Sequence, residues 1–277
     1  MKREKLLFGT AGIPLRASKR NSVSGIKRIR ELGLGCMELE FVQGVRMQAP
    51  GAKKVFEAAK KEEIALSVHA PYYINLNSSE PEKKKASLER IYQAAKIGKL
   101  CGAESIVFHA AFYQKSSKEE TYIKISKCLQ ELGEKLRNDG ISVLLRPETM
   151  GKNSQFGTLE ELLSLSYEIE GVRPCLDFSH LHAREGKVNS YPEFVGIFER
   201  VEEVLGKEGL YDMHMHVSGI DYGKKGEKKH LCLEESDFNY PDLLKAFKDF
   251  KVKGLLICES PNLEEDALLL KNFYANL

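Results

Sequence analysis

Residues 105–148 read SIVFHAAFYQKSSKEETYIKISKCLQELGEKLRNDGISVLLRPE. The apolar, β-branched runs at 105–109 and 141–148 predict two buried strands. Between them, residues 118–138 carry apolar side chains at helical spacing among charged ones, which predicts an amphipathic helix. A strand, a helix and a second strand in this order form a parallel unit with a right-handed crossover.

The same alternation continues along the whole chain. Eight strand-like runs occur, at 6–10, 37–41, 64–69, 105–109, 141–148, 173–178, 213–217 and 254–260. A segment of helical character follows each run. The turn after the first run, FGTAGIP, lacks the glycine pattern of open dinucleotide-binding sheets. Eight such units in 277 residues therefore predict an α/β protein with one (β/α)8 TIM barrel, a single domain over residues 1–277.

Composition limits the class of protein. The chain is 42% hydrophobic and 30% charged with a net charge of +2, which is ordinary for a globular protein with a sizeable core. That charge gives no argument of its own for nucleic-acid binding. No apolar run approaches the length of a membrane span, and the N-terminal apolar stretch is too short for a signal peptide. We expect a cytoplasmic monomer with no membrane partner and with reduced, buried cysteines.

The ends of six consecutive predicted strands carry side chains of the kind that binds metals. These ends meet at one face of a TIM barrel, the face that holds active sites. Buried carboxylates brought together there repel one another unless cations neutralise them. We therefore predict a centre with several divalent ions, zinc or else manganese. Its ligands are His69, His109, Glu148, Asp177, His216 and Glu259 at the strand ends, with His180 and His230 in the loops that follow.

Each of these residues also has a simpler interpretation when it is taken alone. A single His after a strand is more often a hydrogen-bonded structural residue, and a single Glu often caps the next helix. His214 shares a strand face with His216 and either orients a ligand or fills the barrel. Six strand ends in succession would require six independent coincidences, which favours the metal centre.

Two or three adjacent metals favour the hydrolysis of phosphate esters, in which one activates water and the others hold the phosphate and the leaving oxygen. Glu148 lies in the middle of the predicted centre and is the candidate catalytic residue. An alternative is a sugar isomerase or epimerase, in which two glutamates move a proton beside a single metal. That reaction needs only Glu148, Asp177, His216 and Glu259 and leaves four histidines without a role.

Six ordered segments resemble the endonuclease IV family (AP endonuclease family 2), the metal-dependent abasic-site endonucleases of DNA base excision repair. The segments are SVHAPYYINL (67–76), VFHAAF (107–112), RPETMGKNSQFGTLEELLSL (146–165), CLDFSHLHAREG (175–186), MHVSG (215–219) and ICESP (257–261). The resemblance implies a TIM barrel that hydrolyses the phosphodiester 5′ to an abasic site in double-stranded DNA. The products would carry a 3′-hydroxyl and a 5′-deoxyribose phosphate.

The resemblance also implies two to three zinc ions. The first would use His69, His109 and Glu148, and the second would share Glu148 with Asp177, His216 and Glu259. The third would use His180, His230 and an Asp two residues before the loop His. Lys228 stands at that Asp position here, so that Glu227, His182 or Asp221 would have to substitute.

By the same resemblance, Arg46 in the loop FVQGVRMQ (41–48), Tyr72 and Asn75 would contact the DNA. The Lys-rich loop GKKGEKKH (223–230) either lies along the phosphates or is an ordinary solvated loop. Two further departures from the family pattern are Ser218, where the family has Asp, and the absence of an early His in FGTAGIP.

The barrel is also similar to the xylose-isomerase-like sugar isomerases and epimerases. A third class is a barrel that binds DNA lesions without cutting them.

Overall fold

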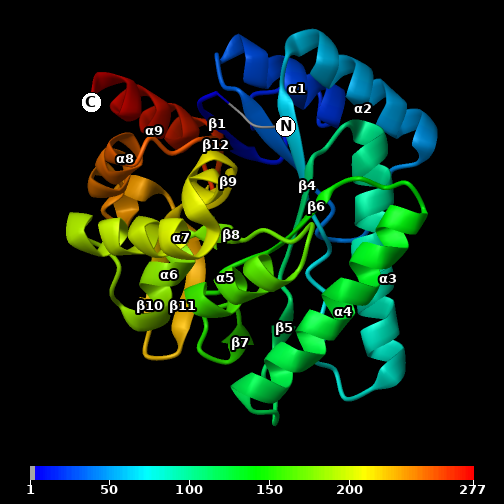
Figure 1. The fold of residues 1–277 in the computed structure, drawn as a ribbon. Helices are drawn as coiled ribbons and strands as arrows, with labels where there is room; N and C mark the ends of the chain where they lie inside the picture. Colours follow the sequence, from blue (N-terminus) through cyan, green and yellow to red (C-terminus); the bar gives the residue numbers. More distant parts are fainter. Residues whose placement is uncertain (1–3) are drawn as a thin grey trace.

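The computed structural model describes residues 4–277. All eight predicted runs are strands, and they form one parallel sheet in the order β6-β4-β3-β2-β1-β12-β9-β8. Isolated parallel bridges, Leu145 to Val172 and Glu148 to Cys175, join the two edges of this sheet. The prediction of a TIM barrel is confirmed (Figure 1). The strands are β1 (Leu6–Ala11), β2 (Cys36–Glu40), β3 (Ala65–His69), β4 (Ser105–Phe108), β6 (Leu144–Pro147), β8 (Cys175–Asp177), β9 (Met213–Val217) and β12 (Gly254–Cys258).

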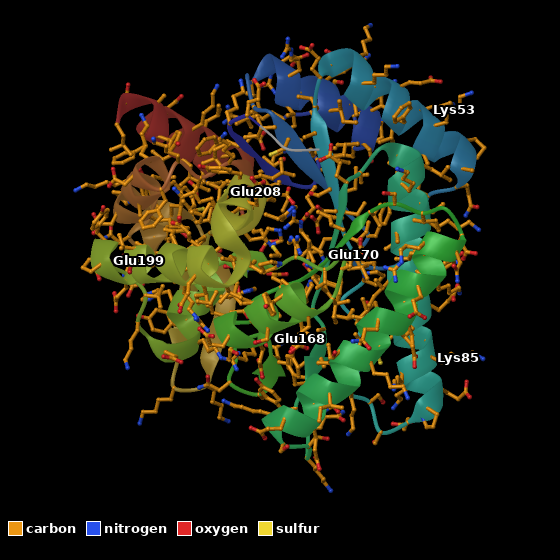
Figure 2. The ribbon with its side chains drawn as sticks, in the orientation of Figure 1. Lys53, Lys85, Glu168, Glu170, Glu199 and Glu208 are labelled. Carbon is orange, nitrogen blue, oxygen red and sulfur yellow. The ribbon has the colours of Figure 1, made fainter. Side chains whose placement is uncertain are left out.

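Helices cover the outside of the barrel (Figure 1). Their charged side chains point outward, as Lys53, Lys85 and Glu199 show (Figure 2). Within residues 4–277 no helix is long and apolar enough to cross a membrane. The helices are α1 (Ser22–Glu31), α2 (Ala49–Glu62), α3 (Pro81–Cys101), α4 (Lys118–Asn138), α5 (Leu159–Glu168), α6 (Phe178–Glu185), α7 (Tyr191–Tyr211), α8 (Tyr240–Asp249) and α9 (Glu264–Asn276), with a short 3₁₀ turn η1 (Leu233–Glu235).

Helix α6 is fixed firmly against the barrel, and it carries one of the candidate ligands. Asp177 caps its N-terminus by accepting a hydrogen bond from the His180 amide. Phe178 is fully buried, with its ring 5.7–6.1 Å from those of Phe194, Phe198 and Phe247. Deleting such a ring from a core typically costs about 3–5 kcal/mol. The packing therefore holds His180 in a defined position above the end of β8.

Two small antiparallel strand pairs interrupt the regular alternation of strands and helices and lie at the same end of the barrel (Figure 1). One pairs β5 (Ala111–Phe112) with β7 (Gln155–Phe156), and the other pairs β10 (Gly219–Gly223) with β11 (Gly226–Leu231). The predicted loop 223–230 therefore lies within the β10–β11 hairpin. Gly226 has a φ of 93°, and a Cβ on it would lie 2.0 Å from the Gly151 carbonyl oxygen. Only glycine allows this hairpin to sit so close to the loop after β6.

Candidate metal centre

Glu148 lies at the centre of the predicted cluster and is almost fully buried. Its Oε2 atom lies 3.2 Å from the Nε2 atoms of both His69 and His109. Its Oε1 atom lies 3.2 Å from His180 Nδ1 and 3.4 Å from His216 Nδ1. A single carboxylate that faces four imidazoles from four different strand ends has the position of a bridging ligand.

The eight predicted ligands fall into three overlapping groups, in each of which the candidate ligand atoms lie within 4.8 Å of one another. The first two groups match the sets that the family resemblance implied. The third differs, because Asp177 accompanies the two remaining histidines, and these lie on α6 (His180) and β11 (His230) rather than in loops. The groups are His69, His109 and Glu148; Glu148, Asp177, His216 and Glu259; and Asp177, His180 and His230.

The polar atoms of these groups are those that a cation would satisfy. Glu148 Oε1, Asp177 Oδ2 and His216 Nδ1 are buried without a hydrogen-bond partner. A buried polar atom left in this state costs about 1–3 kcal/mol. Neutral imidazole and carboxylate are zinc ligands, so the donor set fits a zinc-type ion. His180 Nε2 and His230 Nε2 lie 3.4 Å apart, close to the roughly 3.3 Å between two nitrogens on one tetrahedral zinc.

A β-bulge decides which side chain of the β10–β11 hairpin faces the third group. The β10–β11 register shifts between Asp221 and Tyr222, so that Lys229 pairs with Asp221 whereas Glu227 pairs with Tyr222. Lys228 is the extra residue, and an extra residue reverses the alternation of faces along a strand. Its Nζ atom lies outside, 3.2 Å from Asp221 Oδ1. Glu227 turns inward instead, with Oε2 3.5 Å from His180 Nε2.

His182 does not join the cluster, although it is only two residues from His180. Its Nδ1 atom faces the Lys187 carbonyl at 2.8 Å and its Nε2 atom faces Asp237 at 3.2 Å. A spacing of two residues on a helix places side chains on nearly opposite sides. Asp221, the other candidate substitute, is held by Lys228. Glu227 is therefore the one candidate substitute among the three that the fold brings to His180.

The three residues predicted to contact DNA have different surroundings. The Tyr72 ring is half exposed and stacks on His109, with ring centroids 5.3 Å apart. Arg46 is exposed in the loop after β2. Asn75 joins two neighbouring segments of backbone, because its Oδ1 atom accepts hydrogen bonds from the amide of Asn77 in its own loop and from that of Phe112 on β5.

Two acidic residues of the centre, Glu38 and Glu40, were not among the predicted ligands. Both lie on β2, whose alternate side chains point into the barrel. Glu38 is fully buried beside His214 and His216. Burial raises the pKa of Glu40 to about 8, against the opposing charge of His69. The alternation of acidic and apolar residues in MELE was the available signal, but the same pattern also describes a half-exposed strand.

The charges of the acids determine the protonation of the buried histidines. Burial alone lowers the pKa of His69, but the hydrogen bond and the charge of Glu148 raise it to about 10. Burial opposes charge at two further histidines, but Asp177 and Glu148 raise the pKa of His180 well above its ordinary range. Cys175, followed by Glu259 and the other carboxylates, does the same for the pKa of His216. Without a cation these histidines are protonated at neutral pH, so a metal that binds them displaces protons.

This charge arrangement predicts how the stability of the metal-free protein depends on pH. A histidine with a raised pKa in the folded state stabilises fully below the unfolded value of about 6.5, and this contribution is lost as the pH rises through the folded value. We therefore expect the thermal unfolding temperature of the metal-free protein to fall by several degrees between pH 6.5 and 10. Calorimetry of protein treated with a chelator measures this unfolding temperature at each pH. The metal-loaded protein is the control, because its histidines are already neutral. A flat profile for the metal-free protein would contradict the expectation.

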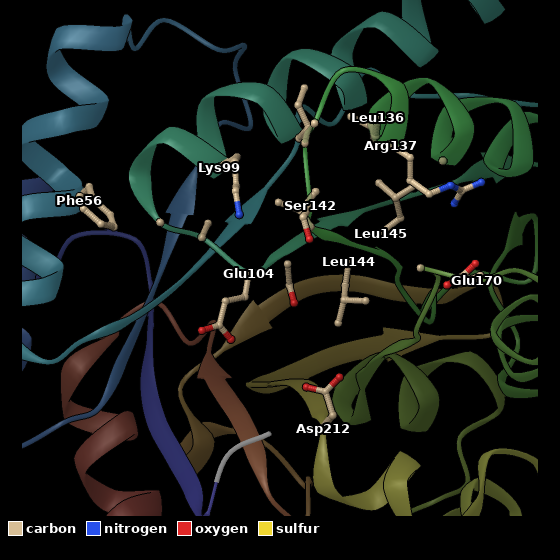
Figure 3. Close-up of a pocket in the computed structure, with 18 residues that line it drawn as sticks. Phe56, Lys99, Glu104, Leu136, Arg137, Ser142, Leu144, Leu145, Glu170 and Asp212 are labelled. Atoms are coloured by element: carbon tan, nitrogen blue, oxygen red, sulfur yellow. The ribbon is translucent and has the colours of Figure 1, made fainter. Parts of the chain in front are cut away.

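A separate cavity of about 1060 Å³ lies at the opposite, N-terminal end of β4 and β6. Figure 3 shows Lys99, Glu104, Arg137, Glu170 and Asp212 around it. No histidine lines it among the described residues. Because the candidate ligands are all at the carboxyl ends of the strands, this cavity is not part of the metal centre.

Fold and site together define a TIM barrel with a centre of metal-binding type at the carboxyl ends of its strands. The chain belongs to the xylose isomerase-like TIM barrel family, whose model matches residues 26–273. The prediction from the sequence, which named the endonuclease IV branch of this family, agrees with weak relatives and with a structural neighbour of that name.

The relatives differ in how much is known of them. An uncharacterized protein of Methanocaldococcus jannaschii is 50% identical, with 98% of each chain covered. The probable endonuclease 4 of Mycoplasma genitalium is 26% identical, covering 75% of this chain and 72% of its own. Among solved structures, a D-tagatose 3-epimerase-like protein has a TM-score of 0.72 at 20% identity and 96% coverage of both chains. Endonuclease IV from Thermus thermophilus has a TM-score of 0.71 at 17% identity, covering 96% of this chain and 98% of its own. These two likenesses show the fold.

Proposed function

We propose that the protein is a metal-dependent endonuclease that hydrolyses the phosphodiester 5′ to abasic sites in double-stranded DNA. The products are a 3′-hydroxyl and a 5′-deoxyribose phosphate. The observation that supports this most strongly is the set of three contiguous ligand groups around Glu148. A one-metal isomerase would need only four of the residues in these groups. We further propose that the enzyme acts as a cytoplasmic monomer with two to three zinc ions.

Different side chains have different roles in this reaction. When bound, the metals supply positive charge that lowers the pKa of water and neutralises the scissile phosphate. Glu148, between the first two groups, orients the attacking water and accepts its proton. Tyr72, stacked on His109 at the mouth of the centre, offers an aromatic surface for the exposed sugar or base at the lesion. With these roles, the cluster would support in-line attack of water on the phosphorus, with the 3′ oxygen as the leaving group.

The rim of the centre carries groups suited to the phosphates of a duplex. Arg46 is exposed in the loop after β2, and Lys224 and Lys225 form the exposed tip of the β10–β11 hairpin. Such contacts position a duplex without reading its sequence. They support an enzyme that recognises a lesion rather than a base sequence.

The direct test is cleavage of a duplex oligonucleotide with one abasic site by the zinc-loaded protein. We expect one cut on the 5′ side of the lesion and none in the undamaged duplex. Binding of the abasic duplex without cleavage would indicate a lesion-binding protein instead.

A single-metal sugar epimerase is the second candidate. The group Glu148, Asp177, His216 and Glu259 supports it, because it places two glutamates and two further ligands around one position. Exchange of a ketose C3 proton with solvent deuterium is the matching assay. A protein with one metal that catalyses this exchange and leaves abasic DNA intact would establish this second function.

The number of bound metals tests the third group. If Glu227 replaces the family's Asp, Glu227→Ala is expected to lower the zinc content from three ions per chain to two, because one carboxylate is lost beside His180. Inductively coupled plasma mass spectrometry after gel filtration gives the count. Asp221→Asn is the matched control, since this acid lies on the same hairpin but pairs with Lys228. Equal zinc contents in both variants would remove Glu227 from the site.

A further inference from the structure

We propose that Glu38 is a positioning residue that fixes the ring of His216 so that Nδ1 faces the metals. This inference rests on the metal centre of the proposed function. Glu38 Oε1 lies 2.9 Å from His216 Nε2, and among the described residues neither of these two buried atoms has a hydrogen-bond partner. The other ring nitrogen, Nδ1, lies 3.4 Å from Glu148 Oε1 and 3.3 Å from Glu259 Oε1.

Glu38 is itself held by side chains from the adjacent strand β3 and from β9 across the barrel. Its Oε2 atom accepts a hydrogen bond of 2.6 Å from Ser67 Oγ on β3 and lies 3.0 Å from His214 Nε2 on β9. All four side chains, those of Glu38, Ser67, His214 and His216, are at most 1% exposed. Oε2 of Glu38 is thus held in place by Ser67 and His214, whereas Oε1 faces His216.

A histidine ligand needs this kind of partner. One ring nitrogen must present a lone pair to the metal, and a carboxylate on the other nitrogen selects that tautomer and makes the ligating nitrogen more basic. Without Glu38, the His216 ring would lose both its fixed orientation and the negative charge behind it. Removal of such a partner typically lowers metal affinity or activity about 10- to 100-fold.

The test is cobalt binding by Glu38→Gln, which keeps the shape of the side chain but removes its charge. We expect the affinity at the group Glu148, Asp177, His216 and Glu259 to fall about 10- to 100-fold, with an altered visible cobalt spectrum. The matched control is Glu264→Gln, because this buried carboxylate accepts hydrogen bonds from the Leu15 and Arg16 amides outside the centre. It should lower stability but leave cobalt affinity and spectrum unchanged.

If Glu38→Gln does not fold, Ser67→Ala provides the second variant, since it loosens Glu38 without removing it. We then expect a smaller loss of cobalt affinity and a displaced Nε2 resonance of His216 in protein with ¹⁵N-labelled histidine. Wild-type affinity, spectrum and resonance in whichever variant folds would overturn the inference, as would a wild-type protein that takes up no cobalt. A protein that binds cobalt normally but leaves abasic DNA intact would refute only the proposed endonuclease, because the effect of Glu38 is measured on metal binding.

Discussion

Glu148→Gln is expected to reduce cleavage of an abasic duplex by at least about a thousandfold, within the range for loss of a group that moves protons, while the barrel still folds. The amide has nearly the volume of the carboxylate but no negative charge. Glu148 faces His69, His109, His180 and His216 at 3.2–3.4 Å. The substitution therefore removes the one anion shared by the first two ligand groups, together with the group that accepts the proton of water.

Single-turnover cleavage kinetics at saturating enzyme would measure this loss, and circular dichroism would verify the fold. His182→Asn is the matched control, because His182 is equally buried on the same helix as His180 but contacts Lys187 and Asp237. The control should retain wild-type cleavage within a few-fold. Wild-type rates in Glu148→Gln would refute the assignment of Glu148.

Removing divalent metals with a chelator is the second change with a large expected effect, and it should abolish cleavage entirely. It should also lower the unfolding temperature by roughly 10 °C. A ligand at a thousand times its dissociation constant stabilises the folded state by about 4 kcal/mol, and each kcal/mol shifts the unfolding temperature of a domain this size by about 2–4 °C. Among the described residues, buried ligand atoms of the cluster such as Glu148 Oε1 and Asp177 Oδ2 have no hydrogen-bond partner, so the loss falls on the centre itself.

Cleavage assays and calorimetry on the same chelated sample measure both effects, and stepwise return of zinc should restore both at the same stoichiometry. Chelator already saturated with zinc is the control for non-specific effects. Manganese in place of zinc tests which ion the centre prefers. Full cleavage by protein that contains less than a tenth of an ion per chain would contradict the proposed mechanism.

Much of the fold could be predicted because its signals are local. A buried strand needs a short apolar run and a helix needs apolar spacing of three and four, and both patterns can be read from neighbouring residues. The capping box of Ser117 and Glu120 begins α4 at Lys118, where the predicted helix begins. Once eight such units are counted, the closed barrel brings the carboxyl ends of all strands to one face. The eight candidate ligands follow from that geometry.

The remaining features of the site depend on contacts that the sequence does not display. Glu38 and Glu40 resemble the solvent-facing residues of a half-exposed strand, and only barrel closure shows that their side of β2 is the interior. His182 is only two residues from His180 in sequence, yet helix geometry directs it to Asp237.

The sequence by itself therefore determined the TIM barrel and the cluster of histidines and acids at its strand ends, because both depend on local patterns and on the closure of the barrel. Only the tertiary structure decided which side chains complete that cluster. The bulge at Lys228 turns Glu227 toward His180, and β3 and β9 enclose Glu38 behind His216. The physical reason is that the direction of a side chain depends on backbone register and on packing by distant strands, neither of which is written in the neighbouring residues.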